Sequence, residues 1–210
     1  RCRCRRRARA HTLRPGVQEF EARHRSKDGA VRDSLMLLTT LDPPVVAVVS
    51  VWTQQYYGAQ MTAALDRLRA KCTELAAYLV TESVPMAGPA IAVGERTTGL
   101  ANVALLRRPD GMDEREWFRR WHLDHTQVAI DTQSTFGYTQ NAVVRALTSD
   151  APQLGAIVEE LFPIEATTSL HAFFGAADDA DLADRAGKMA ASTSAFGANV
   201  NTDTVPTSRY

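Results

Sequence analysis

Two histidines and a tyrosine stand close together in the second half of the chain, and these residue types transfer protons near neutral pH. His122 and His125 are three positions apart, and Tyr138 follows on the next predicted element. An imidazole can take up and return a proton, and a phenol can donate a hydrogen bond to a developing oxyanion. We therefore predict acid–base chemistry with His125 as the general acid or base and Tyr138 as the donor.

Four neighbouring side chains are the candidates for holding a substrate: Trp121, His122, Gln140 and Asn141. On the predicted strand that contains them, Tyr138 and Gln140 share one face. Asn141 points to the other face unless a bulge intervenes, because successive side chains of a strand alternate. The sequence therefore predicts a site where a helix edge meets this strand.

A structural interpretation of the same residues stays open. Trp117, Trp121, His125 and Val128 recur at steps of four, four and three, so they share one helix face, and tryptophans on such a face usually form a core. His125 could then be a histidine satisfied by a backbone carbonyl, and Tyr138 a buried phenol with its hydroxyl paired. Open solvent beside His125 and Tyr138 would favour catalysis, whereas packed side chains would favour a structural role.

We predict neither a metal nor a cofactor. His122 and His125 could both contact a metal ion, but no third ligand stands at a convincing spacing, and the cysteines Cys2, Cys4 and Cys72 are too few for a zinc site. The sequence also contains no phosphate-binding loop, no dinucleotide-binding glycine motif and no nucleophile elbow.

The second half predicts the order β-α-β-β-α-β. Asp113 and Glu116 form a D-x-x-E capping signal, so a helix should begin near Glu114. The other predicted elements are strands at 100–108, 136–147 and 156–162, helical structure over 168–191 that is broken near Gly175 and Asp178, and a last strand within 204–210.

The first half predicts only the last four of these elements. They are strands at 34–40 and 45–52, a helix over 59–79 that covers a sheet, and a strand at 78–85. We therefore predict an α+β fold of two tandem βαββαβ modules, the first lacking a recognisable first strand and helix. The boundaries are 1–32 for a basic arm, 33–86 for the incomplete module, 87–98 for a linker and 99–210 for the complete module.

Charge separates the N-terminal arm from the rest of the chain. Residues 1–32 hold eleven Arg and Lys against three Asp and Glu, although the formal net charge of the whole chain is +0. The arm lacks apolar periodicity, so we predict that it is disordered or does not belong to the native reading frame. It shows no nucleic-acid-binding motif, and no apolar run approaches the roughly 20 residues that span a bilayer. We predict a cytoplasmic protein that contacts neither nucleic acid nor membrane.

The motifs of the second half resemble the EthD domain family. RRPDGMDEREWFRRWHLDHTQVA followed by FGYTQNAVV is similar to the family's pattern of a Trp-x-x-x-His helix and a Tyr-x-Gln-Asn strand. The matching positions are Trp121, His125, Tyr138, Gln140 and Asn141. Arg120 stands where the family has an aromatic residue. The resemblance covers residues 99–210 well, 34–85 weakly and 1–32 not at all.

The resemblance implies a ferredoxin-like dimeric α/β-barrel, in which two sheets enclose a cavity and tandem copies form the barrel within one chain. It implies cofactor-independent chemistry of a monooxygenase, decarboxylase, dehydratase or cyclase type on a small aromatic, polyketide-like or ether-derived substrate. The alternatives are a non-enzymatic module that binds a small molecule and a structural dimerisation module. A small-molecule ligand and a homo-oligomer formed through the barrel or a sheet edge are the expected partners. Fold alone does not decide between these functions.

Overall fold

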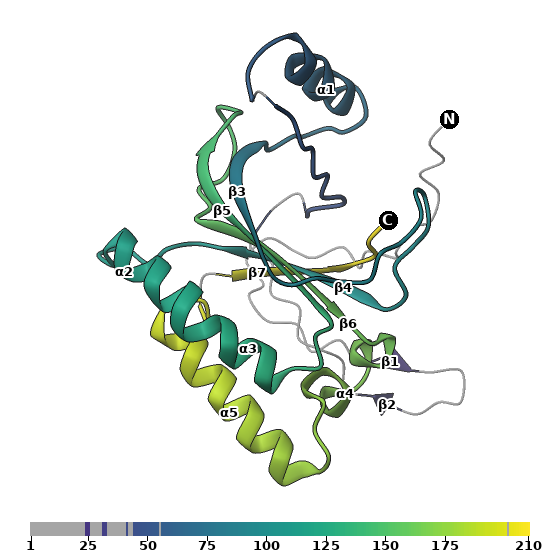
Figure 1. Cartoon of the computed structure of the whole chain (residues 1–210), viewed down its shortest axis with the longest axis vertical. Helices are drawn as coiled ribbons and strands as arrows, with labels where there is room; N and C mark the ends of the chain where they lie inside the picture. Colours follow the sequence, from purple (N-terminus) through teal and green to yellow (C-terminus); the bar gives the residue numbers. More distant parts are fainter. Residues whose placement is uncertain (1–23, 26–30, 33–40, 42–43, 55, 201) are drawn as a thin grey trace.

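The computed structural model describes residues 24–25, 31–32, 41, 44–54, 56–200 and 202–210. It shows a mixed α+β architecture in which helices cover one face of a five-stranded antiparallel sheet (Figure 1). The elements are β1 (His24–Arg25), β2 (Val31–Arg32), α1 (Ala59–Arg69), β3 (Tyr78–Met86), β4 (Leu100–Leu106), α2 (Glu114–Arg119), η1 (Arg120–His125), α3 (Thr126–Thr132), β5 (Gly137–Ala146), β6 (Ala156–Phe162), η2 (Ile164–Thr167), α4 (Leu170–Phe174), α5 (Asp179–Ala195) and β7 (Thr202–Thr207).

The second half of the chain has the predicted order of elements. Strand β4 is followed by the helical stretch α2-η1-α3, then by strands β5 and β6, helix α5 and strand β7. The strands lie side by side in the order β3-β5-β6-β4-β7, and every adjacent pair is antiparallel. Strand β6 is therefore the middle strand, β4 lies between β6 and the edge strand β7, and β3 from the first half extends the sheet beyond β5.

Local signals in the sequence set the helix boundaries. The carboxylate of Asp113 accepts a hydrogen bond from the backbone N–H of Glu116 at 3.0 Å, so α2 begins at the predicted position. Gly175 ends α4 in the left-handed conformation, with φ 61°. The side chain of Asp178 then caps α5 by accepting from the backbone N–H of Asp181 at 2.9 Å. The predicted break in the last helical region is thus confirmed.

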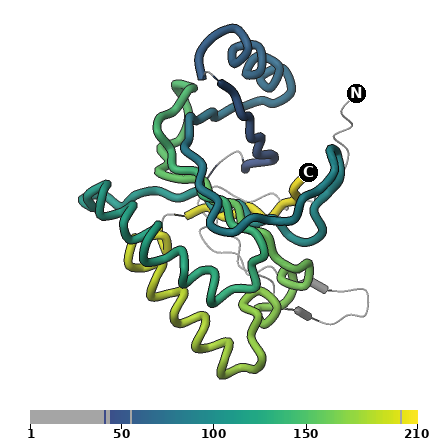
Figure 2. Tube along the Cα trace, viewed as in Figure 1, coloured from purple at the N-terminus to yellow at the C-terminus, as the bar shows by residue number. Residues whose placement is uncertain are grey.

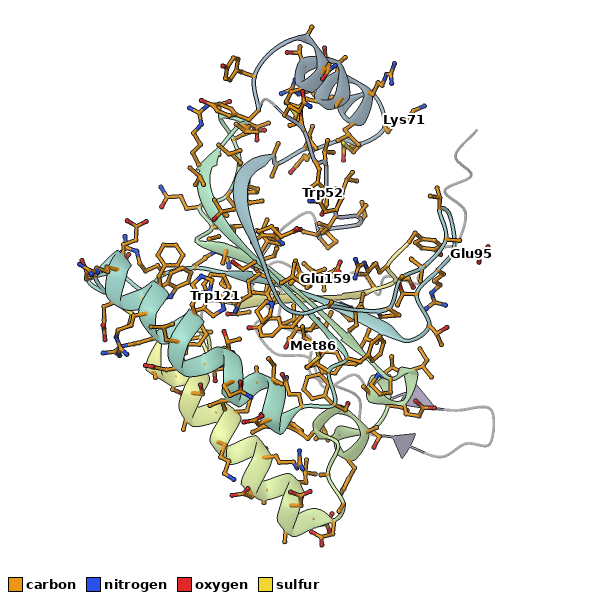
Figure 3. All side chains as sticks on the ribbon, viewed as in Figure 1. Trp52, Lys71, Met86, Glu95, Trp121 and Glu159 are labelled. Atoms are coloured by element: carbon orange, nitrogen blue, oxygen red, sulfur yellow. The ribbon has the colours of Figure 1, made fainter. Side chains whose placement is uncertain are left out.

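The main core lies between the sheet and the helices α2, η1 and α5. Trp117 and Trp121 are almost completely buried, and their ring centroids are 5.4 Å apart. The indole N–H of Trp117 donates to the backbone carbonyl of Phe196 at 3.1 Å, which connects α2 to the end of α5. Figure 3 shows Trp121 in the layer between the helices and the sheet. The predicted packing role of both tryptophans is confirmed.

Two predicted elements of the first half differ from the structure. The predicted helix over 59–79 ends at Arg69. The chain from Ala77 onward pairs instead with the end of β5, where the N–H of Leu147 donates to the carbonyl of Ala77. Helix α1 buries no residue, and it lies at the far end of β3 and β5 instead of covering the sheet (Figure 1). The predicted strand at 45–52 pairs with no strand in the described part of the chain and is mostly exposed. Figure 2 shows this dark-blue segment on the side of the sheet away from α5.

Part of the predicted N-terminal organisation lies outside the described residues, including the predicted strand at 34–40 and most of the arm. The described pieces of the arm, β1 and β2, pair with each other in a separate two-stranded sheet. No helix in the described part of the chain is long and apolar enough to cross a membrane.

The start of β4 depends on a glycine, which gives a first test of the fold. Gly99 has φ +117°, and a β-carbon there would overlap the carbonyl oxygen of Phe162 on the neighbouring strand β6. Gly99→Ala should therefore lower the free energy of unfolding by about 3 kcal/mol or more, measured by urea denaturation.

Gly94→Ala is the matched control, because Gly94 also has a positive φ, of +84°, but faces open space. It should cost about 1 kcal/mol from backbone strain alone. Equal losses in the two variants would contradict the close approach of β4 and β6 at Gly99.

Candidate functional site

A π-helical turn positions the helix face that meets the sheet. Between α2 and α3, the segment η1 has wide turns, and the N–H of Thr126 bonds back to the carbonyl of Trp121, five residues earlier. This turn keeps Trp117, Trp121, His125 and Ala129 buried on one face at uniform steps of four, where a regular α-helix would rotate away from that spacing. Ala129 therefore joins the buried face in place of the predicted Val128, which is half-buried.

Gln140 on β5 connects several polar side chains under this turn through hydrogen bonds. Its side chain is only 2% exposed, and its amide nitrogen donates to the hydroxyl oxygens of Thr126 at 2.8 Å and Tyr138 at 3.2 Å. Its amide oxygen lies 2.9 Å from Nδ1 of His122. One amide thus connects the helix to the phenol on the same strand.

These hydrogen bonds decide which ring nitrogen of His122 carries the proton. The hydroxyl of Thr126 donates its own proton to the carbonyl of Trp121 at 3.1 Å, so it must accept from the amide nitrogen of Gln140. The amide oxygen therefore faces His122, and only a protonated Nδ1 can donate to it. A neutral His122 then has its free lone pair on Nε2, which has no hydrogen-bond partner in the described part of the chain.

His122 borders a solvent-accessible hollow of about 570 Å³ beside α2 and η1. Its described lining consists of Asp113, Arg115, Glu116, Phe118, Arg119, His122 and Leu123. The ring of Phe118 stacks on that of His122, with 5.7 Å between centroids and 21° between planes. Neither His125 nor Tyr138 belongs to the described lining.

The charged side chains around the hollow differ in whether they form ion pairs. Hydrogen bonds from Arg119 and Arg120 lower the pKa of the Glu116 carboxyl to about 2, so this carboxylate is ionised and pairs with both guanidinium groups. Arg119 also contacts Asp124 at 3.0 Å. Arg115 makes no ion pair with any described residue, so it is the cation of the lining available to an anionic ligand.

His125, the predicted general acid or base, is packed in the interior. Its side chain is 6% exposed, its Nδ1 lies 2.9 Å from the hydroxyl of Ser192 on α5, and its ring contacts that of Phe196. Burial lowers the pKa of His125 to about 4, because the interior disfavours the charged ring. His125 is therefore neutral at pH 7.

Tyr138, the predicted donor, is buried beside a second titratable group. Burial raises the pKa of the Tyr138 phenol, and the nearby Glu160 carboxylate raises it further. Burial also raises the pKa of Glu160 to about 7. Glu160 lies between Tyr138 and Asn102 in the sheet register, and the Oδ1 of Asn102 is a buried acceptor with no partner among the described residues. A protonated Glu160 is the form that this pocket of the core favours.

The six predicted site residues thus fall into three places. Trp121, His122, Tyr138 and Gln140 form one contiguous group between η1 and β5. His125 belongs to the neighbouring packed layer with α5, and no hydrogen bond joins it to Tyr138. The side chain of Asn141 lies on the opposite face of β5, since its register partners are Glu82 and Ile157, without an irregularity between β5 and β6.

Sequence reasoning missed three contributors to this region. Thr126 stands four residues after His122, so helical spacing could have placed it on the same face. Ser192 gave no signal that separates it from ordinary helix residues. Glu160 gave only a weak one, as part of the acidic doublet Glu159-Glu160, whose side chains point to opposite sides of a strand. Among the described residues, no group of three or more His, Cys, Asp or Glu side chains could hold a metal ion.

A scan against protein-family models finds no match for the chain, and a search of curated proteins finds no significant match.

The two buried titratable groups should make stability depend on pH with opposite signs. The pKa of His125 is 6.5 in the unfolded chain and about 4 in the folded chain. As the pH falls from 6.5 to 4, this residue therefore lowers the free energy of unfolding. Glu160 is protonated more readily in the folded chain, near 7 against 4.5, so it favours folding less as the pH rises. Each shift corresponds to about 3 kcal/mol, and the two partly cancel.

Replacing one of the two titratable groups should reveal the pH dependence that the other contributes. In Glu160→Gln, the free energy of unfolding should rise between pH 4.5 and 6.5, relative to the wild type. In His125→Asn, it should fall over the same range relative to the wild type. Urea denaturation of the three proteins measures these differences, and exposed carboxylates cancel because all three share them. Slopes of the same sign in both variants would contradict the assignment.

Proposed function

We propose that the chain is an EthD-like protein that performs cofactor-independent acid–base chemistry, with His122 as the proton-transferring residue. The observation that carries this proposal is the hydrogen bond from Nδ1 of His122 to the buried amide of Gln140, beside a hollow. This bond leaves Nε2 as the basic atom and holds the ring in one orientation. In this proposal the role predicted for His125 belongs instead to His122, three residues earlier on the same helical stretch.

The arrangement of strands supports a ferredoxin-like barrel as the setting. Strands β7-β4-β6-β5 and their helices follow the βαββαβ order, and β3 adds the last strand of the first half to the free edge of β5. In a tandem barrel, a strand of one module must pair with the edge of the other module, as β3 does with β5. We propose that the second half of the chain is the complete module and that β3 belongs to the incomplete one.

The hollow favours a small planar substrate with an acidic C–H bond next to a carbonyl group. Phe118 and Leu123 provide apolar surface, and the exposed cation Arg115 lies on the same helix face as His122. Nε2 of His122 would remove the proton, and the charge left on the carbonyl oxygen would be stabilised by the guanidinium of Arg115. The protonated imidazole would then return the proton to another atom of the substrate. Aromatic, polyketide-like and ether-derived carbonyl compounds all fit this description.

A second candidate function is a non-enzymatic binding or dimerisation module. The observation in its favour is the burial of His125 and Tyr138 among packed side chains, which is the arrangement expected of a structural role. In that case the hollow beside His122 would hold a ligand without changing it.

Exchange of the methyl protons of 4-hydroxyacetophenone for deuterium, followed by NMR in heavy water, separates the two functions. The wild-type protein should accelerate this exchange above the buffer rate. His122→Asn should lower the acceleration by about 10²- to 10⁴-fold, because asparagine can still donate to Gln140 but has no basic nitrogen. The control His171→Ala removes an exposed histidine that pairs with Asp179 at 3.0 Å and should keep the wild-type rate.

Full exchange activity in His122→Asn would contradict the role of His122. Binding of the compound to the wild type, seen as chemical-shift changes without exchange, would favour the binding module instead.

A further inference from the structure

Residues 45–52, with the sequence VVAVVSVW, present an unusual surface on the side of the sheet away from α5. Val46 is 88% exposed and Trp52 is 73% exposed, and Val48, Val49 and Val51 are also exposed. Figure 3 shows Trp52 on this side, far from the layer that contains Trp121. Exposed apolar side chains grouped in this way are typical of an interaction surface.

The backbone of this segment is also unpaired. It belongs to no strand or helix, and within the described part of the chain its N–H and C=O groups make no hydrogen bond with another backbone group. Valine and tryptophan are enriched in β-strands because they pack well on a pleated surface. The segment therefore has the composition of a strand but pairs with none of the described strands.

The edges of the main sheet are poor partners for it. Strand β3 contains Pro85 and strand β7 contains Pro206, and a proline removes a backbone donor from an edge. Prolines at an edge disfavour the addition of a further strand. Residues 45–52 contain no proline.

The segment itself is a suitable partner for an identical segment. Residues 44–65 contain no charged side chain, so two copies could pair without placing like charges opposite each other. Six or seven residues of high β-propensity, low charge and no proline are the signature of segments that pair with their own kind. Beyond the end of the segment, the guanidinium of Arg145 on β5 lies 4.7 Å from the ring centre of Tyr56.

We infer that residues 45–52 are a homodimer interface, at which the segments of two copies of this chain form an antiparallel two-stranded ribbon about a two-fold axis. Each copy then supplies backbone hydrogen-bonding partners for the segment of the other, and valines from both chains contact one another across the ribbon. The inference does not depend on the chemistry at His122, which lies on the other side of the sheet.

Light scattering after size-exclusion chromatography tests the pairing. The full chain should have twice the 23.0 kDa mass of a single copy, with dissociation on dilution. Val49→Lys should raise the dissociation constant at least ten-fold, because the substitution places charged groups in the ribbon. Val93→Lys is the matched control, since Val93 is a fully exposed valine outside the segment, and this variant should dimerise like the wild type.

A cysteine scan tests the register. In a chain with Cys2, Cys4 and Cys72 replaced by serine, single cysteines at positions 46–51 are oxidised and separated by non-reducing electrophoresis. A two-fold antiparallel ribbon places one residue opposite its own copy, so one position should cross-link in far higher yield than its neighbours.

Three outcomes would overturn the inference. They are a monomer at every concentration, as pairing of the segment within its own chain would give, an assembly that grows beyond two copies, and a dimer that Val49→Lys leaves intact. Equal cross-linking at adjacent positions would also exclude a fixed two-fold register.

Discussion

The need to satisfy one buried amide organises the region where helix and sheet meet. Gln140 is surrounded by protein, so its oxygen and nitrogen must find partners there, and an unpaired buried polar group costs about 1 to 3 kcal/mol. It finds them in His122 and Thr126 on the helix and in Tyr138 on its own strand. These contacts hold the helix over β5. They also determine which ring nitrogen of His122 carries the proton.

The π-helical turn makes this arrangement compatible with a tightly packed core. The same stretch of chain must bury two tryptophans against the sheet and bring two polar side chains onto Gln140. Wide turns in η1 let the carbonyl of Trp121 accept from both the N–H and the hydroxyl of Thr126. The hydroxyl then has no proton left to donate, so it accepts from the amide. Helix geometry, core packing and the tautomer of His122 are therefore linked.

Much of the second half could be predicted from local patterns. The capping pair Asp113 and Glu116, the apolar strands and the tryptophan spacing all specify structure through contacts between near neighbours in sequence, and each was confirmed. The early end of α1 at Arg69 was not signalled by the local pattern, and the pairing between Ala77 and Leu147 across the fold could not be read from it either. Residues 45–52 were predicted as a strand from their composition, but they pair with no described strand. Local propensity alone does not supply a neighbouring strand.

The candidate site was predicted as a region but not in its internal roles. Periodicity places His122 and His125 on adjacent parts of one helix surface. It cannot tell which of them meets a polar partner on the sheet and which meets α5, because that depends on the rotation of the helix and on Ser192 far along the chain. The distinction between a tautomer-locked imidazole at a hollow and a neutral buried one is a tertiary property.

The tautomer of His122 is the most direct test of this account. Two-bond ¹H–¹⁵N NMR correlations on protein labelled with ¹⁵N-histidine distinguish a protonated from an unprotonated ring nitrogen. With the imidazole neutral, the account predicts that Nδ1 of His122 carries the proton and Nε2 does not, and that Gln140→Leu abolishes this preference. A neutral ring protonated at Nε2, or a wild-type pattern that Gln140→Leu leaves unchanged, would contradict it.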